Sequence, residues 1–428
     1  MSIDSHIWDF LVIGLLLLGV TLGSSWITRL PLSYALIYLI AGIFLGPYGF
    51  GIIDLSPDAE FLERLTEIVV IVSLFACGIK MNRPLNPWAW HSTVRLIGLL
   101  MPLTIGAIAL LAHFCLGYDW GAAILLGAIL APTDPVLASE VQLTDTDDHN
   151  ELRFGLTSEG GLNDALAFPF VYFGLYWLKD NQWDNWFKSW VAVDLIWAIM
   201  AGIAGGIVVA RIINALSKRL RRAYGVEEEM EDLIALATIL ITYALTEAIN
   251  GYGFLAVFVA GVVVRRSRSL DSEKKTSQLH FTGLMERLLE VGTILLVGAM
   301  LRIEPVFTYG GQTLLIAGAL IFLIRPIATW ISTIGDNLRP TTRLLFGWFG
   351  IRGVGSLYYL TYALSDGIPD EIASPLSWIT FFTVTLSVII HGISATPLMS
   401  WYEKRFGQEN RLEPETLEEE VDREADMD

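Results

Sequence analysis

Charged residues are scarce in this chain of 428 amino acids, which is 17% charged and 54% hydrophobic. Soluble domains carry about 25% charged residues and seldom repeat apolar runs that are long enough to cross a bilayer. The scarcity of charge therefore excludes an ordinary soluble protein. It predicts an all-α, polytopic membrane protein.

Cysteine and histidine are also rare, with 2 and 6 residues. Both cysteines, Cys77 and Cys115, fall in apolar stretches, so the sequence predicts no disulfide framework. It contains no phosphate-binding loop, no Cys/His cluster with metal-ligand spacing and no hydrolase nucleophile elbow. We therefore expect neither an enzyme nor a protein with a resident cofactor, and we expect no nucleic-acid partner.

Long apolar runs predict about thirteen membrane-spanning helices. They are expected at residues 6–23, 31–46, 60–79, 93–115, 120–142, 154–178, 189–215, 231–249, 253–265, 281–301, 309–334, 341–364 and 375–400. The first run lacks a basic n-region and a small-residue cleavage site, so we interpret it as a retained helix and not as a signal peptide.

Basic residues gather on alternate connections between these helices. Because such residues favour the cytoplasmic side, the N-terminus is predicted to lie outside and the C-terminus in the cytoplasm. Residues 1–402 are expected to form the transmembrane part. Residues 403–428 contain 11 acidic and 4 basic residues, which predicts a short, solvated cytoplasmic tail.

One carboxylate, Asp134, lies in an apolar stretch between Pro132 and Pro135. The prolines interrupt the helical hydrogen bonds, and an ionisable residue at membrane depth points to a functional site. Backbone carbonyls freed there, together with Thr133 and Asp134, would suit a small, hard cation. Capping of the half-helix after Pro135 is an alternative role for Asp134, and the two roles are compatible.

A second carboxylate, Asp164, follows Asn163 in what the sequence predicts to be an unbroken helix. A lone carboxylate in an apolar helix is costly to ionise, so it can hold a proton or a cation but not both comfortably. That competition would couple the movement of the two ions. A structural, hydrogen-bonded aspartate is the alternative.

A second interrupted helix is predicted around Arg352, which has glycines at positions 347, 350, 353 and 355. It is the twelfth predicted helix and the Asp134 helix is the fifth, so the two run in opposite directions. Paired interrupted helices indicate an inverted-repeat transporter, although two unrelated kinks are an alternative. Glu159 needs a positive partner at membrane depth, and Arg325 and Arg352 are both candidates for a structural ion pair.

Four motifs in this order resemble the NhaP-like sodium/proton antiporters of bacteria: TDP at 133–135, EGGLND at 159–164, GFLAVFVAG at 253–261 and GIRG at 350–353. The resemblance implies a homodimer in the bacterial inner membrane that works by alternating access. It implies a core domain, about 93–178 and 309–400, that contains the two crossed helices. A dimerisation domain is implied at about 1–92 and 189–301.

The resemblance also implies roles for individual residues. The carboxylate for the transported ion falls on Asp164, with Asn163 beside it, and the ligands of the unwound helix fall on Asp134 and Thr133. The buried bridge falls on Glu159 and Arg325, with Arg352 at the second crossing. The Asn-Asp pair implies electroneutral exchange.

Two positions depart from the family pattern. Gly160 stands where relatives often have a serine that helps to bind the ion, and no acidic residue precedes Gly78 in the third helix. A replacement ligand would have to come from backbone, water or a side chain such as Ser158.

The sequence thus predicts a secondary transporter that exchanges Na⁺ for H⁺, with Li⁺ or K⁺ as alternatives. A cation channel is one rival. An intramembrane aspartyl protease is another, disfavoured because Asn163 precedes Asp164 where such enzymes have glycine.

Overall fold

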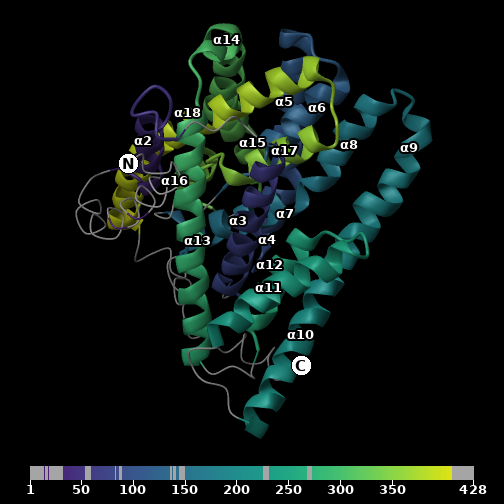
Figure 1. Ribbon diagram of the computed structural model, residues 1–428, viewed down its shortest axis with the longest axis vertical. Helices are drawn as coiled ribbons and strands as arrows, with labels where there is room; N and C mark the ends of the chain where they lie inside the picture. Colours follow the sequence, from purple (N-terminus) through teal and green to yellow (C-terminus); the bar gives the residue numbers. More distant parts are fainter. Residues whose placement is uncertain are drawn as a thin grey trace, which may run out of the picture.

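The regular structure of this protein is helical throughout the residues that its computed structural model describes. These residues are 14, 18, 32–53, 59–81, 83–85, 89–134, 137, 141–143, 150–224, 231–267, 272–336 and 338–406. The all-α prediction is confirmed for them (Figure 1). The predicted span at 6–23 lies outside this part of the chain apart from two residues, and so do Pro135 and residues 407–428 of the predicted tail.

The described residues form a series of helices. In chain order they are α2 (Tyr34–Leu45), α3 (Ala59–Lys80), α4 (His91–Arg95), α5 (Met101–Leu116), α6 (Trp120–Leu130), α7 (Glu151–Leu166), α8 (Phe168–Lys179), α9 (Trp183–Ser189), α10 (Ala198–Tyr224), α11 (Glu231–Glu247), α12 (Gly253–Arg265), α13 (Ser272–Met300), α14 (Glu304–Ala319), α15 (Arg325–Ser332), α16 (Pro340–Trp348), α17 (Val354–Ser365) and α18 (Asp370–Phe406).

Three π-helical segments join pairs of these helices into longer rods. They are Leu96–Leu100 between α4 and α5, Trp190–Trp197 between α9 and α10, and Leu320–Ile324 between α14 and α15. Within the described residues, four continuous helical segments are long and apolar enough to cross a membrane: His91–Leu116, Trp183–Arg221, Glu304–Ser332 and Asp370–Phe406. They correspond to the spans predicted at 93–115, 189–215, 309–334 and 375–400.

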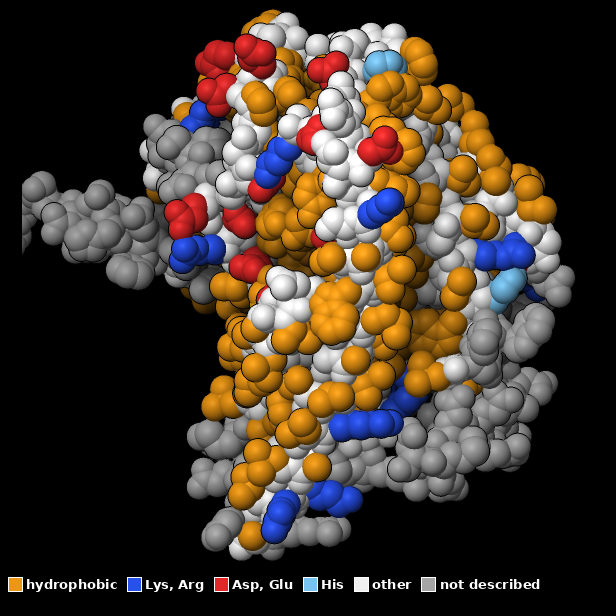
Figure 2. Space-filling model, turned by 90° about the vertical axis from the view of Figure 1, so that its right-hand side faces the viewer, with side chains coloured by type: hydrophobic (Ala, Val, Ile, Leu, Met, Phe, Trp, Pro, Cys, Tyr) orange, Lys and Arg blue, Asp and Glu red, His pale blue; other side chains and the backbone are white. Residues whose placement is uncertain are grey.

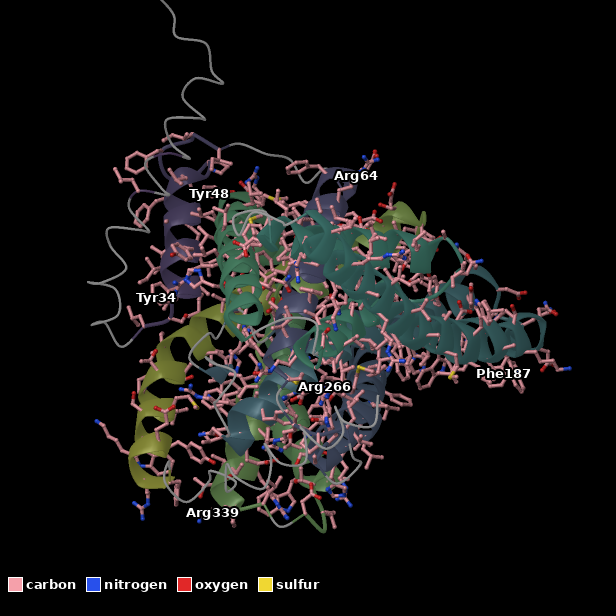
Figure 3. All side chains as sticks on the ribbon, turned by 90° about the horizontal axis from the view of Figure 1, so that it is seen from below. Tyr34, Tyr48, Arg64, Phe187, Arg266 and Arg339 are labelled. Carbon is pink, nitrogen blue, oxygen red and sulfur yellow. The ribbon has the colours of Figure 1, made fainter. Side chains whose placement is uncertain are left out.

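The surface agrees with a lipid environment. Hydrophobic side chains cover most of the face shown in Figure 2, and several large ones are exposed, including Phe114, Phe307 and Leu344. Extended exposed apolar surface of this kind is typical of contact with membranes or partners. The rod formed by α9 and α10 extends to one side, with Phe187 at the edge opposite Tyr34 and Tyr48 (Figure 3).

Both predicted helix interruptions are present. The predicted span at 120–142 begins as α6, which stops at Leu130, and the chain is non-helical from Pro132 to Asp134. The predicted span at 341–364 consists of α16 and α17, separated by residues 349–353. The sequence signals, proline in the first case and clustered glycine in the second, mark both breaks correctly.

One expectation was wrong, because the span predicted as an unbroken helix at 154–178 is interrupted. Helix α7 ends at Leu166 and α8 begins at Phe168. Pro169, the second residue of α8, has no N–H to donate to the preceding turn, and its ring clashes with that turn. The single residue between the two helices, Ala167, keeps α-helical backbone angles, so the interruption is a local break in the hydrogen-bond ladder shortly after Asp164.

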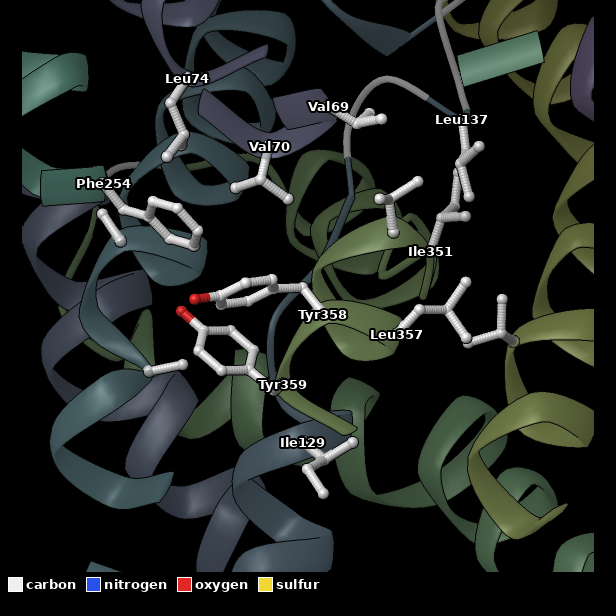
Figure 4. Packing of buried hydrophobic residues seen from close by; sticks show 14 of the residues in the cluster. Val69, Val70, Leu74, Ile129, Leu137, Phe254, Ile351, Leu357, Tyr358 and Tyr359 are labelled. Carbon is white, nitrogen blue, oxygen red and sulfur yellow. The ribbon is translucent and has the colours of Figure 1, made fainter. Parts of the chain in front are cut away.

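Helix α3 lies in the middle of the molecule, packed against α12, α13 and α17 (Figure 1). Its crossing with α12 is close because two glycines meet there: a Cβ on Gly78 would lie 2.3 Å from the carbonyl oxygen of Phe258 and 3.0 Å from Cα of Gly261. Figure 4 shows the core around this region, with Val70 and Leu74 of α3 near Phe254 of α12. The glycine crossing fixes the position of α3 beside the interrupted helices.

We expect Gly78→Ala to destabilise the protein by about 1–3 kcal/mol, the usual cost of overpacking. The added methyl group would meet backbone atoms that cannot turn aside. Thermal unfolding of the purified protein in detergent measures the effect, with Gly106→Ala as the control because nothing lies within 4 Å of a Cβ at that position. Equal unfolding midpoints for the two variants would contradict the proposed role of this crossing.

Candidate functional site

The two helix interruptions cross and satisfy one another's backbone groups. The amide of Asp134 donates to the carbonyl of Ile351 over 2.8 Å. The guanidinium of Arg352, a fully buried side chain, donates to the carbonyl of Pro132 over 3.0 Å and also to that of Ala131. These contacts matter because lipid offers no water to backbone groups that leave a helix.

The side chain of Asp134 caps the N-terminus of α17, which is the second half of the other interrupted helix. Its Oδ2 accepts a 2.8 Å hydrogen bond from the amide of Val354, the first residue of α17. A carboxylate at a helix N-terminus is stabilised by the unpaired amides and by the helix dipole. A capping role was expected for Asp134 at the half-helix after Pro135; the structure gives it that role at α17. The position after Pro135 lies outside the described residues.

The Asp164 carboxylate is buried on α7, with 7% of the residue exposed, and its Oδ1 has no hydrogen-bond partner among the described residues. It lies against the first turn of α17, where a Cβ on Gly355 would be 2.3 Å from Oδ1. Asp134 and Arg352 are both close enough to interact with it electrostatically, the former unfavourably and the latter favourably. A buried polar atom without a partner calls for an explanation, and a proton or a cation would supply the missing partner.

The neighbouring Asn163 connects α7 to the first break. Its Nδ2 donates to Oγ1 of Thr133 over 2.9 Å, and no described residue is a hydrogen-bond partner of its Oδ1. The unpartnered oxygens of Asn163 and Asp164 are therefore adjacent in sequence and close to the unwound backbone. Thr133 Oγ1, Asn163 Oδ1 and the Asp164 carboxylate are oxygen atoms of the kind that hard cations prefer.

Glu159 pairs with Arg325, one of the two partners that the sequence left open. The contact is bidentate, at 2.6 and 2.9 Å, and both side chains are buried. Arg325 also donates to the carbonyl of Phe346 over 3.1 Å. A Cβ on Gly350 would lie 2.3 Å from Nε of Arg325, so this glycine leaves room for the guanidinium. The pair ties α7 to α15 and to the end of α16.

Ser158 was considered as a replacement for the missing serine ligand. Its hydroxyl lies 2.6 Å from Oγ1 of Thr93 and donates to the carbonyl of Gly155 over 3.2 Å. The hydrogen bonds of Ser158 thus join α7 to α4 and do not include Thr133, Asn163 or Asp164. Its role as a ligand stays a prediction.

Two residues of the site were missed by sequence reasoning. Ser387 on α18 accepts from the amide of Arg352 over 2.8 Å, and Tyr359 on α17 donates from its hydroxyl to the main-chain carbonyl of Asp164. Ser387 could have been noticed because it lies four residues before His391, on the same face of one helix. Nε2 of His391 lies 2.9 Å from the carbonyl of Trp348, close to the second break. No sequence pattern singled out Tyr359.

Buried carboxylates at two crossed, interrupted helices of a polytopic helical protein are typical of secondary transporters. Comparisons agree with this class. The sequence model of the sodium/hydrogen exchanger transmembrane region matches residues 13–401. The chain therefore belongs to the sodium/hydrogen exchanger family, whose members are multi-pass membrane transporters and not enzymes.

Two relatives with similar sequences are cation/proton antiporters by name. The K⁺/H⁺ antiporter NhaP of Alkalimonas amylolytica is 28% identical over 398 residues, which cover 91% of this chain and 66% of the relative. The K⁺/H⁺ antiporter NhaP2 of Shewanella sp. strain MR-4 is 25% identical over 404 residues, which cover 92% and 67%. The chain thus spans about two thirds of the length of these relatives.

A solved structure shares the fold. The sodium proton antiporter MjNhaP1 from Methanocaldococcus jannaschii at pH 8 matches with a TM-score of 0.72 and 23% identity, covering 92% of this chain and 98% of that one. The predicted fold class and the predicted resemblance are confirmed. The inverted repeat, the domain division and the roles of individual site residues stay predictions.

We expect Glu159→Gln to destabilise the protein by about 3–5 kcal/mol, because it leaves the Arg325 guanidinium buried without a counter-charge. Thermal unfolding in detergent measures this loss. Glu60→Gln is the control: it breaks the exposed pair with Arg64, whose side chains are 72% and 74% accessible, and such pairs contribute about 0–1 kcal/mol. A midpoint for Glu159→Gln close to that of Glu60→Gln would show that the buried pair is dispensable.

Proposed function

We propose that this protein exchanges a monovalent cation for H⁺, with Na⁺ as the expected cation and Li⁺ or K⁺ as alternatives, and that both ions compete for Asp164. The observation that supports this most directly is the buried Asp164 Oδ1 beside the crossed helix breaks, for which the described part of the chain offers no hydrogen-bond partner. A proton would make this oxygen a donor, and a cation would coordinate it together with the oxygens of Asn163 and Thr133.

The charges around the site support a one-for-one exchange. Among the described residues next to the two helix breaks, the buried carboxylates are Asp134, Glu159 and Asp164 and the buried cations are Arg325 and Arg352; the buried Lys80–Glu286 pair is a separate one. Glu159 is paired with Arg325. Arg352 donates to the carbonyl groups of Ala131 and Pro132, which lie in the non-helical segment just before Asp134. One negative charge is left over, and either one proton or one monovalent cation neutralises it. Exchange of the two is electroneutral.

Alternating access would present this site to each side of the membrane in turn. Every residue of the site lies in the segments assigned to the core domain, about 93–178 and 309–400. We propose that this core moves against a dimerisation domain, about 1–92 and 189–301, in a homodimer of the bacterial inner membrane. The N-terminus would lie outside, and the C-terminus with its acidic tail in the cytoplasm. The transported cation is a substrate, so no resident cofactor is required.

The choice of cation needs direct comparison. The names of the two bacterial relatives specify K⁺/H⁺ exchange, and the name of the solved structure specifies sodium and protons. Na⁺, K⁺ and Li⁺ should therefore each be tested in proteoliposomes that contain a pH-sensitive dye. A channel would carry cation current without proton counterflow in this assay, and a protease would carry neither.

We expect Asp164→Asn to abolish cation-driven proton movement in these proteoliposomes, because asparagine can neither release a proton nor neutralise a cation. Size-exclusion chromatography should still give a folded dimer. The matched control is Asp184→Asn, an exposed aspartate in the first turn of α9, which should exchange normally. Robust exchange by Asp164→Asn would remove Asp164 from its proposed role.

Direct competition also fixes the pH dependence of cation affinity. Cation binding requires the deprotonated carboxylate, so in the pH range where Asp164 is mostly protonated the half-saturating cation concentration should rise about tenfold for each unit that the pH falls. At higher pH it should become constant. Exchange rates at several cation concentrations and pH values measure this profile, and a flat profile throughout would rule out a shared site.

A further inference from the structure

The end of α7, directly behind Asp164, is unusual for a membrane helix. The last four carbonyl groups of an α-helix have no partner within the helix, and α7 ends at Leu166. The Asp164 carbonyl is one of these four. Pro169 has no N–H for the carbonyl of Ala165, four residues earlier, and its ring crowds that carbonyl, so the helical ladder is broken in the turn that contains Asp164. An unpaired carbonyl at this depth would be costly in lipid.

Tyr359 satisfies that carbonyl. Its hydroxyl donates to the main-chain oxygen of Asp164, and its side chain is fully buried. The ring is held edge-on by Phe168, with 5.1 Å between centroids, and by Tyr358, with 5.4 Å between centroids. Figure 4 shows the two tyrosines side by side on α17. The hydroxyl is therefore held in place by packing on both sides.

The same face of α17 also receives the Asp164 carboxylate. Gly355 and Tyr359 are four residues apart, which places them one above the other on a helix. Gly355 leaves the space that Oδ1 of Asp164 occupies, and Tyr359 binds the main-chain oxygen of the same residue. One turn of α17 thus contacts Asp164 at two separate points.

We propose that Tyr359 is a positioning residue for ion exchange: by capping the end of α7, it holds the Asp164 carboxylate against Gly355 and beside Asn163 and Thr133. This inference rests on the proposed function, since it assigns a consequence for cation binding. Without the hydroxyl, the Asp164 carbonyl must find another donor. The end of α7 can do this only by turning, and turning moves the carboxylate away from the other oxygens.

The variant Tyr359→Phe tests this, because it removes the hydroxyl and keeps the ring. Leaving a buried acceptor unpaired has a cost that corresponds to about a tenfold change in binding. We expect the half-saturating cation concentration in proteoliposomes to rise about tenfold, with the maximal rate changed by less than about threefold. Tyr358→Phe is the matched control: its ring packs 4.8 Å from Phe254 in the same cluster, and its half-saturating concentration should stay within about twofold of the parent protein.

Hydrogen–deuterium exchange gives a second measurement that does not depend on transport. In Tyr359→Phe, the amides of residues 160–171 should exchange faster, while those of α3 should exchange at the rate of the parent protein. An unchanged half-saturating concentration with unchanged exchange at 160–171 would overturn the inference. Loss of thermal stability alone, with normal cation affinity, would also overturn it, because that is the result expected of a purely structural tyrosine.

The two proposals fail in different ways. If Asp164→Asn abolishes exchange but Tyr359→Phe matches Tyr358→Phe, only the role of Tyr359 is wrong. If Asp164→Asn exchanges normally, the proposed function is wrong and the role of Tyr359 in it falls as well.

Discussion

The structure of this protein depends on how two interrupted helices satisfy each other's backbone in a medium without water. The amide of Asp134 pairs with the carbonyl of Ile351, and Arg352 supplies donors to carbonyls of the opposite break. Neither break could persist alone at membrane depth, because each unpaired group would cost several kcal/mol. The crossing is therefore the condition under which polar backbone and carboxylates can exist in the interior.

The three buried carboxylates near this crossing differ in the partners that the neighbouring helices provide. Asp134 is engaged by the amide of Val354 at the start of α17, and Glu159 is neutralised by Arg325. Asp164 is buried to a similar degree, but one of its oxygens has no hydrogen-bond partner in the part of the chain that the structure describes. Similar burial thus gives two carboxylates that are engaged by other groups of the protein and one, Asp164, that we propose binds the exchanged ion. The difference comes from the donors that the neighbouring helices present.

Much of this arrangement could be predicted from sequence, because its signals are local. Proline on both sides of Asp134 and glycine around Arg352 interrupt helices wherever they occur, so the two breaks were predictable. The partner of Glu159 did not follow from local signals, which left Arg325 and Arg352 open; the family resemblance pointed to Arg325, and the packing of α15 confirms it. The break after Asp164 was missed because the apolar run through Pro169 continues for a full helix length. Tyr359 could not be found, because its bond joins residues 195 positions apart in the sequence.

The glycines of the second break leave space for charged side chains, whereas their clustering in the sequence first indicates only a loosened helix. Clustered glycine loosens a helix, yet Gly350, Gly353 and Gly355, three of the four glycines near Arg352, all have backbone angles outside the left-handed region. Each instead faces a charged group: Gly350 faces Arg325, Gly353 faces Asp134 and Gly355 faces Asp164, with 2.3 Å between the charged side chain and the position of a Cβ. Any larger residue would displace one of these groups. The glycines therefore determine where these charges lie, and the proposed exchange site occupies the space that they leave.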